Sequence, residues 1–447
     1  MLKRLIPFLT WMLPLVAFSA SNDTYLQSVP DIPAANVGIY IENIRTGEVV
    51  MDVNGEIPLI PASVTKAITS ATVLSTSSPD DCFETEIIAD GPIKNGILKG
   101  NIVVYATGDP TIESAYFPEY SGVADSVASA LRHMGVKEVS GCVLASYPAA
   151  MEECVPDGWM SEDLMWPYGA AHHALNYADN KFVLSMPSKR CQPEIPGLKI
   201  NFVPSRRATK IEMSNKKITV TGRKSRKSST ALSNPDPESS MCKAIELALT
   251  GQGVAVSGKK LKHSGHRTLI YRHQSPKYAD ILKSLMFRSD NMMTEGMLRT
   301  VAAGRSRKDA IDAELTLWAN NGVDTCGIVI EDGSGLSRNN RITPYFLADV
   351  LVWMARNNNS DNRYLQCFPR AGQDGTMRNF LKDSPLDGRL ATKTGSMRNV
   401  QCYAGYMLGD DGVPSHVVVV MLNGFSSRAT VKKAIGDLLI ERLHGSI

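Results

Sequence analysis

The chain has 447 residues, which at about 100–200 residues per domain predicts two or three domains and excludes a small disulfide-stapled scaffold. Hydrophobic residues make up 43% and charged residues 21%, so the composition excludes wholesale disorder, collagen and a multi-span membrane protein. The net charge of +3 gives no reason to expect nucleic acid or another polyanion as a partner.

The first 21 residues have the pattern of a secretory signal peptide. Lys3 and Arg4 precede an apolar run from Leu5 to Ala17, and small residues suited to cleavage follow. This run is shorter than the roughly 20 residues that span a bilayer, and no later run is long enough. We therefore expect an exported protein of the periplasm or cell envelope, without a transmembrane anchor in the mature chain.

Eight cysteines occur, an even number that is compatible with disulfides in an exported chain. Buried unpaired thiols are an equally good interpretation. No pair is spaced C-x-x-C, which argues against a zinc ribbon or a thioredoxin-like redox site. We assign no cysteine a catalytic role.

The elements predicted along the chain begin with a β-hairpin, because apolar and polar residues alternate over Val37–Ile44 and Glu48–Val53 around a turn. A helix with one apolar face follows Pro61. Residues 83–265 then contain short strand-like runs between glycine and proline turns, which indicates a separate β-rich domain. Its basic stretch 206–227 is interpreted as a solvated hairpin and loop, with attraction to anionic envelope polymers or lipid head groups as the alternative. Residues 224–240 have the composition of a mobile loop.

From residue 266 onward the pattern changes to a short strand, several helices and two final strands, Val400–Leu408 and His416–Leu422, before a helix over Ala429–Leu443. Strands at both ends of the chain with helices between them suit one sheet. We therefore predict a signal peptide (1–21), a discontinuous α/β (α+β) domain (22–82 and 266–447) and an inserted β-rich domain (83–265).

The first candidate motif is Ser63-Val64-Thr65-Lys66, of the form S-x-x-K, at the start of the predicted helix. Three residues are about one helical turn, so the lysine amine lies beside the serine hydroxyl. A serine hydroxyl is a weak nucleophile that needs a base, and a buried lysine of lowered pKa can serve. Three other serine–lysine pairs share the spacing, and only this one opens a long helix.

Two further motifs supply complementary groups. Ser289-Asp290-Asn291 follows a predicted helix that ends near Arg288; its hydroxyl can pass a proton to a leaving amine, and the Asn291 amide can hold a substrate backbone. Lys393-Thr394-Gly395 occurs once, before the strand-like Val400–Leu408. There the lysine offers a positive charge for a carboxylate, and glycine leaves room for a peptide.

In this order, the three motifs resemble the set S-x-x-K, S-D-N and K-T-G of the penicillin-binding proteins and β-lactamases. The first two motifs, 226 residues apart here, are closer together in class A β-lactamases, so an inserted domain is expected. The layout resembles the class C penicillin-binding proteins of the peptidase S13 type, D-alanyl-D-alanine carboxypeptidases and endopeptidases related to penicillin-binding protein 4. Further stretches carry the resemblance, including Gly108-Asp109-Pro110, Tyr168-Gly169-Ala170, Asp332 to Arg338, Gly372 to Thr376 and Ala404-Gly405-Tyr406.

The resemblance implies a penicillin-binding transpeptidase fold and a serine DD-peptidase that acts on peptidoglycan stem peptides and is acylated by β-lactams, with no metal or organic cofactor. It implies Ser63 as nucleophile and Lys66 as a neutral base, whose pKa we expect burial and a positive Lys393 to lower. Ser289 and Asn291 form the relay, and the backbone N–H groups of Ser63 and Ser396 receive the oxyanion. The remaining substrate-binding candidates are Thr394, Gly395, Ser396 and Arg338.

Several points remain open in the sequence. A secreted β-lactamase and an inactive envelope-binding protein of the same fold are the alternatives, and a metallohydrolase built on His263, His266 and His273 or on His172-His173 lacks the H-E-x-x-H motif. The family holds a free substrate amine with an acid of the inserted domain, for which this chain offers Glu152, Glu153 and Asp157. The sequence does not decide the balance of carboxypeptidase, endopeptidase and acyl-transfer activity, the third residue of the stem peptide, the disulfide pairing or the oligomeric state.

Overall fold

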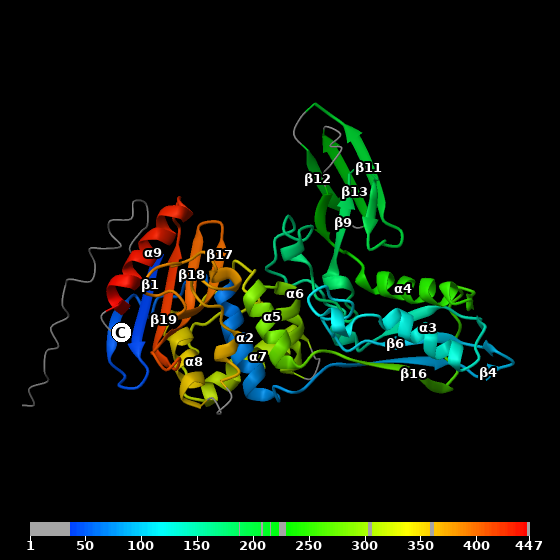
Figure 1. The fold of residues 1–447 in the computed structure, drawn as a ribbon, viewed down its shortest axis with the longest axis horizontal. Helices are drawn as coiled ribbons and strands as arrows, with labels where there is room; N and C mark the ends of the chain where they lie inside the picture. Colours follow the sequence, from blue (N-terminus) through cyan, green and yellow to red (C-terminus); the bar gives the residue numbers. More distant parts are fainter. Residues whose placement is uncertain are drawn as a thin grey trace, which may run out of the picture.

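The computed structural model describes residues 36–186, 188–206, 209–214, 216–222, 229–302, 306–357 and 362–444, so the predicted signal peptide lies outside the described residues. The two ends of the chain form one part of an elongated molecule and the middle of the chain forms the other (Figure 1). Within the described ranges, no helix combines the length and apolarity needed to cross a bilayer.

A five-stranded antiparallel sheet of order β17-β18-β19-β1-β2 forms the centre of the first part. Its strands are β1 (Val37–Asn43), β2 (Val49–Val53), β17 (Leu390–Met397), β18 (Val400–Leu408) and β19 (Pro414–Asn423). The hairpin and the two final strands predicted from the sequence therefore occur, and they pair with each other as one sheet. β1 lies between β2 and β19, so the start of the chain joins its end.

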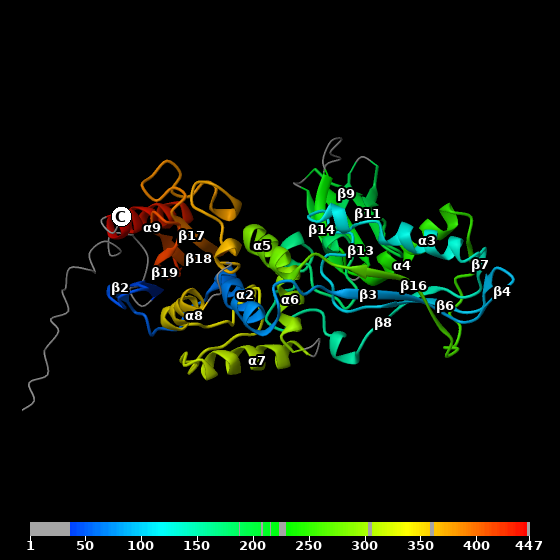
Figure 2. The ribbon, with the colours of Figure 1, turned by 60° about the horizontal axis from the view of Figure 1, so that its bottom comes forward.

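Helices cover both faces of this sheet, which explains why all nine residues of β18 are buried. The helix α9 (Arg428–Leu443) packs on one face, in a core cluster that contains Tyr403 and Met407 of β18. On the other face, α2 (Thr65–Thr76) and α8 (Pro344–Asn357) share a larger cluster with Cys402 and Ala404. Figure 2 shows α9 on one side of the sheet and α2 and α8 on the other. Because successive side chains of β18 point to opposite faces of the sheet, this one strand contributes to both core clusters.

The described residues of the first part form three more helices, α5 (Tyr278–Arg288), α6 (Asn291–Thr300) and α7 (Arg307–Asn320). Of these, α5 and α6 lie between the sheet and the inserted part (Figure 1). Both α5 and α6 contribute to the larger core cluster together with α2. This packing consequently brings together the start of α2, the junction of α5 and α6, and the strand β17.

The described residues of the inserted part form four small sheets. Two have the strand orders β16-β3-β6-β8 and β15-β7-β5-β4, and they share a core cluster with the helices α3 (Val123–His133) and α4 (Pro237–Gly251). Their strands are β3 (Glu84–Asp90), β4 (Ile93–Lys94), β5 (Ile97–Leu98), β6 (Asn101–Tyr105), β7 (Glu138–Val139), β8 (Val143–Ser146), β15 (Ala255–Val256) and β16 (Arg267–Gln274).

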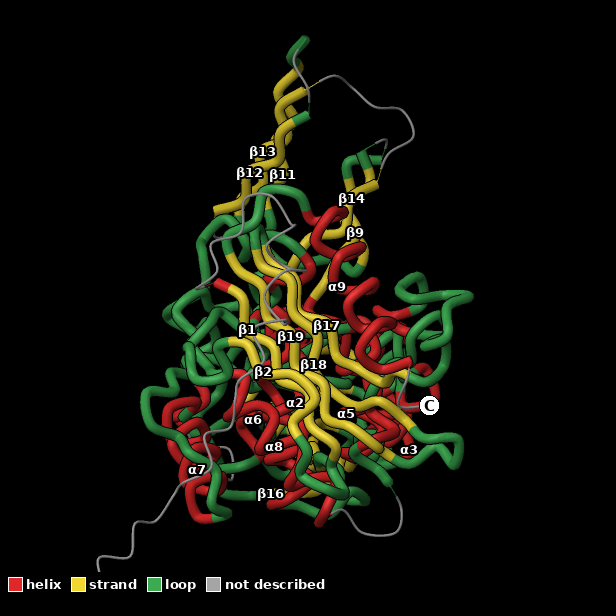
Figure 3. The backbone as a smooth tube through the Cα atoms, turned by 90° about the vertical axis from the view of Figure 1, so that its left-hand side faces the viewer, coloured by secondary structure: helices red, strands yellow, loops and turns green. Residues whose placement is uncertain are grey.

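The other two sheets, of orders β10-β9-β14 and β11-β13-β12, project away from the body of the molecule (Figures 1 and 3). Their strands are β9 (Lys181–Ser185), β10 (Arg190–Gln192), β11 (Lys199–Pro204), β12 (Lys210–Ser214), β13 (Lys217–Gly222) and β14 (Ser229–Ser233). A small separate core cluster, which includes Phe182, Ile218 and Leu232, holds these two sheets together.

Two features differ from the sequence-based expectations. First, β16 pairs with β3 over Glu84–Asp90, so we propose that the inserted part extends to Gln274 rather than to residue 265. Second, the stretch 224–240 was expected to be a mobile loop, but residues 229–233 form β14 and α4 begins at Pro237, while 224–228 lie outside the described residues. Asp236 caps α4 by accepting a hydrogen bond from the backbone N–H of Ser239, which ties this segment down. Disulfides and unpaired thiols were both left open by the sequence, and in the structure all eight cysteines are free thiols.

Candidate active site

Ser63 lies in a strained turn at the beginning of α2. It is the middle residue of a 3-10 turn, Ala62–Val64, and Ala62 has a left-handed backbone conformation with a φ of 48°. Such a conformation costs a non-glycine residue about 1–3 kcal/mol and is typical of functional sites. A hydrogen bond of 2.9 Å from Thr65 Oγ1 to the Ala62 carbonyl holds the turn, and Ser63 stays partly exposed.

Lys66 is fully buried, and its amine has three partners. Its Nζ lies 3.0 Å from Ser63 Oγ, 2.5 Å from Asn291 Oδ1 and 2.6 Å from the Ser334 carbonyl oxygen. The two carbonyl-type oxygens can only accept hydrogen bonds, whereas the serine hydroxyl can also donate. In its neutral form, the Lys66 amine therefore donates its two hydrogens to Asn291 and Ser334, and its lone pair points toward Ser63.

Ser289 and Asn291 lie where one helix ends and the next begins. Ser289 follows α5 in a left-handed conformation with a φ of 59°, and Asn291 is the first residue of α6. Asp290 caps α6 by accepting the N–H of Met293, and it forms an ion pair of 2.9 Å with Lys181 of the inserted part. Asn291 Nδ2 donates to the Tyr168 carbonyl at 2.7 Å, which points Oδ1 toward Lys66. The inserted part thus orients this motif.

The strand β17 borders the same region. Lys393 is fully buried, and its Nζ donates to Ser289 Oγ at 3.0 Å and to the Thr394 carbonyl at 2.7 Å. A Cβ added at Gly395 would lie 2.5 Å from the Pro61 carbonyl oxygen. The glycine therefore lets β17 approach the turn that carries Ser63, whereas the sequence suggested that it leaves room for a peptide.

Some backbone groups of β17 point away from β18, to the other side of the strand. The Leu390 carbonyl accepts from Ala371 and the Thr392 N–H donates to Pro369, both on the side away from β18. Alternate residues of an antiparallel strand direct their backbone groups to the same side, so the N–H groups of Thr394 and Ser396 also point away from β18. The side chain of Ser396 is exposed and its Oγ donates to Gln401 at 2.8 Å.

Arg338 is the predicted site residue without a contact to this constellation. Among the described residues its guanidinium makes no hydrogen bond or ion pair, and its carbonyl accepts from Arg341 at 2.8 Å. Of the three acids considered for a substrate amine, Glu153 is engaged in an ion pair with Arg307. For the metal alternative, no group of three potential ligands gathers anywhere in the described part of the chain.

The two buried lysines differ in their electrostatic surroundings. Burial lowers the pKa of Lys66 to about 8, against the opposing effect of the carboxylates of Asp332, Glu295 and Asp290. Burial and then the charge of Lys66 lower the pKa of Lys393 well below its usual value. The expected effect of burial on Lys66 is confirmed, but Lys393 is not among the causes of the shift, so its charge does not lower the pKa of Lys66 as the sequence suggested. The carboxylates stabilise the charge on Lys66, and among the described neighbours of Lys393 none acts in this way.

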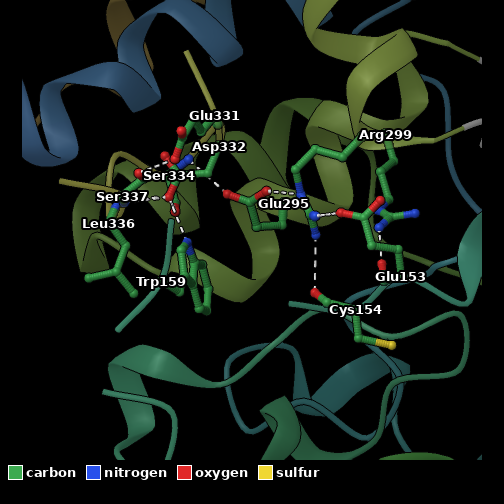
Figure 4. A network of polar contacts seen from close by, with 12 residues as sticks. Glu153, Cys154, Trp159, Glu295, Arg299, Glu331, Asp332, Ser334, Leu336 and Ser337 are labelled. Atoms are coloured by element: carbon green, nitrogen blue, oxygen red, sulfur yellow. Dashed lines mark hydrogen bonds and ion pairs between the residues drawn. The ribbon is translucent and has the colours of Figure 1, made fainter. Parts of the chain in front are cut away.

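The Ser334 carbonyl contacts Lys66, and a buried polar network holds the Ser334 loop in place. Figure 4 shows this network. Glu295 of α6 is fully buried, accepts the Ser334 N–H at 2.9 Å and binds Arg307 Nε at 3.1 Å. Asp332 accepts hydrogen bonds from the N–H groups of Gly335, Leu336 and Ser337.

The inserted part supplies the outer members of this network. Trp159 donates its indole N–H to Asp332 at 2.7 Å, and Arg307 reaches the carboxylate of Glu153 and the carbonyl of Cys154. Gly158 permits the close approach, because a Cβ there would collide with Ser337 Oγ. The insertion therefore packs directly behind the loop that contacts Lys66.

Comparisons with known proteins show that this chain is similar to one family over most of its length. The model of the D-Ala-D-Ala carboxypeptidase 3 (S13) family matches residues 18–442. The D-alanyl-D-alanine carboxypeptidase DacB of Haemophilus influenzae is 27% identical over 433 residues, covering 90% of this chain and 88% of that protein. A D-alanyl-D-alanine carboxypeptidase of Actinomadura is 26% identical over 455 residues, covering 93% and 82%.

Solved structures show the same fold. The crystal structure of penicillin-binding protein 4 from Haemophilus influenzae superposes with a TM-score of 0.80 at 24% identity, covering 94% of this chain and 99% of that one. Its complex with a β-lactam gives a TM-score of 0.76 at 25% identity, covering 95% and 99%. Since the family model spans nearly the whole chain, this protein is a member of the D-Ala-D-Ala carboxypeptidase 3 (S13) family.

Proposed function

We propose that the protein is a serine-type D-alanyl-D-alanine carboxypeptidase that removes the terminal D-alanine of peptidoglycan stem peptides through an acyl-enzyme on Ser63. The observation that carries this proposal is the set of partners around Lys66 Nζ. Two of them can only accept hydrogen bonds, and the third is the Ser63 hydroxyl at 3.0 Å. A neutral Lys66 in this position is a general base for Ser63.

The negative charge of the bound substrate allows Lys66 to lose its proton. The C-terminal carboxylate of a stem peptide binds beside Lys393 and Thr394, and a nearby negative charge raises the pKa of a lysine. The positive charge of the lysine pair then moves from Lys66 to Lys393, and Lys66 becomes neutral when substrate is bound. The lowered pKa of Lys393 and the carboxylates near Lys66 thus fit a base that is activated on binding.

The chemical steps follow from the remaining groups. Lys66 takes the Ser63 proton, and Ser63 Oγ attacks the carbonyl carbon between the two D-alanines. The N–H groups of Ser63 and Ser396 stabilise the oxyanion, and loss of one such donor costs about 10²–10³ in rate. Ser289 gives its proton to the departing amine as the C–N bond breaks and is reprotonated from Lys393, 3.0 Å away. Water then hydrolyses the ester and releases the shortened peptide.

The same pathway accounts for the expected inhibitor and location. A β-lactam ring mimics the scissile amide, so it acylates Ser63, and its ring-opened product stays attached. Peptidoglycan lies outside the cytoplasm, so this function requires export to the cell envelope, for which residues 1–21 have the pattern of a signal peptide.

The decisive experiment combines adduct detection with product analysis. Wild-type protein and Ser63→Ala are exposed to a labelled penicillin, and intact-mass spectrometry then detects the acyl-enzyme. The release of D-alanine from a defined pentapeptide measures the reaction itself. We expect one adduct and D-alanine release for the wild type and neither for Ser63→Ala. An adduct that persists on Ser63→Ala, or rapid turnover of the wild-type adduct, would contradict the proposal.

A further inference from the structure

A pocket of about 640 Å³ lies where the inserted part meets the helices α5 and α6. Its walls come from residues 82–84 at the start of the inserted part, from the ends of β6 and β8 with the residues that follow them, and from α6. We call it the α6 pocket. Its volume is in the range of about 300–1,000 Å³ that is typical of sites for small organic ligands. None of the candidate catalytic residues is among the described residues that line it.

The lining of the α6 pocket is mostly apolar and aromatic. On α6, the lining residues Gly296, Arg299 and Thr300 are three and four positions apart, so they share one face of the helix. The other walls carry large apolar and aromatic side chains, namely Phe83, Tyr105, Tyr147, Met151 and Tyr278. A ligand that fills this pocket therefore needs an apolar body.

Arg299 is the only lysine or arginine among the described residues of this lining. The residue is buried, with an exposed fraction of 3%. Its Nη1 and Nη2 donate hydrogen bonds to the carbonyl oxygens of Ala150, at 3.3 Å, and of Glu153 (Figure 4). Its Nε has no partner within the described part of the chain. The described hydrogen-bond partners of this buried positive charge are therefore uncharged oxygens.

The carboxylates near Arg299 pair with another residue. Glu153 and Glu295 both form their ion pairs with Arg307. Burial and then the charge of Arg307 lower the pKa of Arg299, and the two carboxylates offset only part of that effect. A guanidinium nevertheless keeps its proton in proteins. Because a buried charge is costly unless an opposite charge pairs with it, an anion that reaches Arg299 would be stabilised.

The other titratable groups of the lining leave Arg299 as its one buried charge. His172 is buried, and its Nε2 lies 2.7 Å from the Gly108 carbonyl, which can only accept, so the ring proton is on Nε2. Burial, and then the charge of Arg299, lower the pKa of His172 to about 3, so the ring is neutral. Glu84, the acid among the described lining residues, is exposed and accepts from Gln274 at 2.8 Å, so solvent screens its charge.

We propose that the α6 pocket is a second ligand site, which binds a small monocarboxylate with an apolar or aromatic body. Arg299 receives the carboxylate, because a hydrogen bond between two charged groups is stronger than one to a neutral oxygen. The apolar and aromatic walls contact the body of the ligand. The site makes no use of Ser63, so this inference goes beyond the proposed function.

Cinnamate and cinnamamide are matched probes of this site, because they share an aromatic body and differ in the charge at one end. Each probe is titrated into the full-length protein, and ligand-observed NMR measures the dissociation constant. A hydrogen bond to a charged group is worth about a factor of ten or more in affinity. We therefore expect saturable binding of cinnamate and an affinity for cinnamamide that is about tenfold lower.

Two variants test where cinnamate binds. Arg299→Gln removes the charge, so we expect the affinity for cinnamate to fall about tenfold, to the level of cinnamamide. Thr300→Phe adds a ring on the same face of α6 and leaves Arg299 in place, so both probes should lose affinity. This second variant decides the question if circular dichroism shows that Arg299→Gln does not fold. Lys308→Gln, which removes an exposed cation of α7, is the control that leaves both affinities unchanged.

The competing explanation is that cinnamate binds beside Lys393, where the proposed function places a substrate carboxylate. Loss of cinnamate binding in Lys393→Met, together with full binding in Thr300→Phe, would establish that explanation and overturn the α6 pocket. Equal affinities of the wild type for acid and amide would also overturn it, as would absence of saturation up to about 10 mM, beyond the range of a specific small-ligand site. Absence of a penicillin adduct would overturn the proposed function alone, because cinnamate binding involves no acyl-enzyme.

Discussion

The surroundings of Lys66 and Lys393 differ although both amines are completely buried. Behind Lys66 lie the carboxylates of Asp332, Glu295 and Asp290, which oppose the effect of burial on its pKa. The Lys393 amine contacts a hydroxyl and a backbone carbonyl, and the charge of Lys66 adds to the effect of burial. Burial weakens both charges, and the neighbouring carboxylates oppose this effect at Lys66. A substrate carboxylate bound beside Lys393 would oppose it there as well.

The strongest test of this comparison removes the proposed base. Lys66→Met keeps the apolar stem without an amine, and we expect the rate of acylation by a labelled penicillin to fall about 10²–10⁴-fold, the usual contribution of a general base. Stopped-flow or gel-based adduct formation measures the rate, and circular dichroism establishes that the variant is folded. Acylation within tenfold of the wild-type rate in a folded variant would assign the base role to another group.

A smaller loss is expected when the strand of Lys393 is moved away from Ser63. In Gly395→Ala, the new Cβ would lie 2.5 Å from the Pro61 carbonyl, so β17 has to shift. A misplacement of about 1 Å in an active site can reduce the rate about 10²-fold, and we expect a loss of this size in acylation. Gly251→Ala, at the end of α4, serves as the control, because nothing lies within 4 Å of the added Cβ and its backbone is not left-handed. Wild-type acylation by Gly395→Ala would show that the close approach is dispensable.

The sequence predicted the side chains of the site and much of the sheet. The S-x-x-K spacing anticipated the 3.0 Å contact between Lys66 and Ser63, and the pattern over Val400–Leu408 coincides with β18. The end of the helix near Arg288 was also correct. These features depend on local periodicity, which a sequence displays directly.

The parts that were missed depend on backbone atoms and on pairing between distant segments. Ser334 and Tyr168 lie in stretches that carry the family resemblance, but they contribute carbonyl oxygens, which every residue has, so the sequence gives no signal for their part in the site. The strand β16 pairs with β3 across the whole insertion, which local patterns do not reveal. Asp236 and Pro237, by contrast, did carry a usable signal: a capping residue followed by proline is a typical helix start, although we interpreted it as a loop.

The smallest predicted effect comes from neutralising one of the carboxylates near Lys66. Glu295→Gln keeps an oxygen to accept the Ser334 N–H but removes the negative charge, which raises the pKa of Lys66 in the wild type. Removing it lowers that pKa below about 8, so more of the amine is neutral at a given pH. When the acylation rate is measured against pH, we expect its acidic limb to move to lower pH by about one unit.

The other charged neighbours of Lys66, Asp332 and Asp290, and the second lysine, Lys393, remain in place in this variant. Asp312→Asn, on the exposed face of α7, is the matched control. A limb that stays at the wild-type pH in a folded Glu295→Gln variant would mean that this carboxylate only supports the Ser334 loop and does not tune the base.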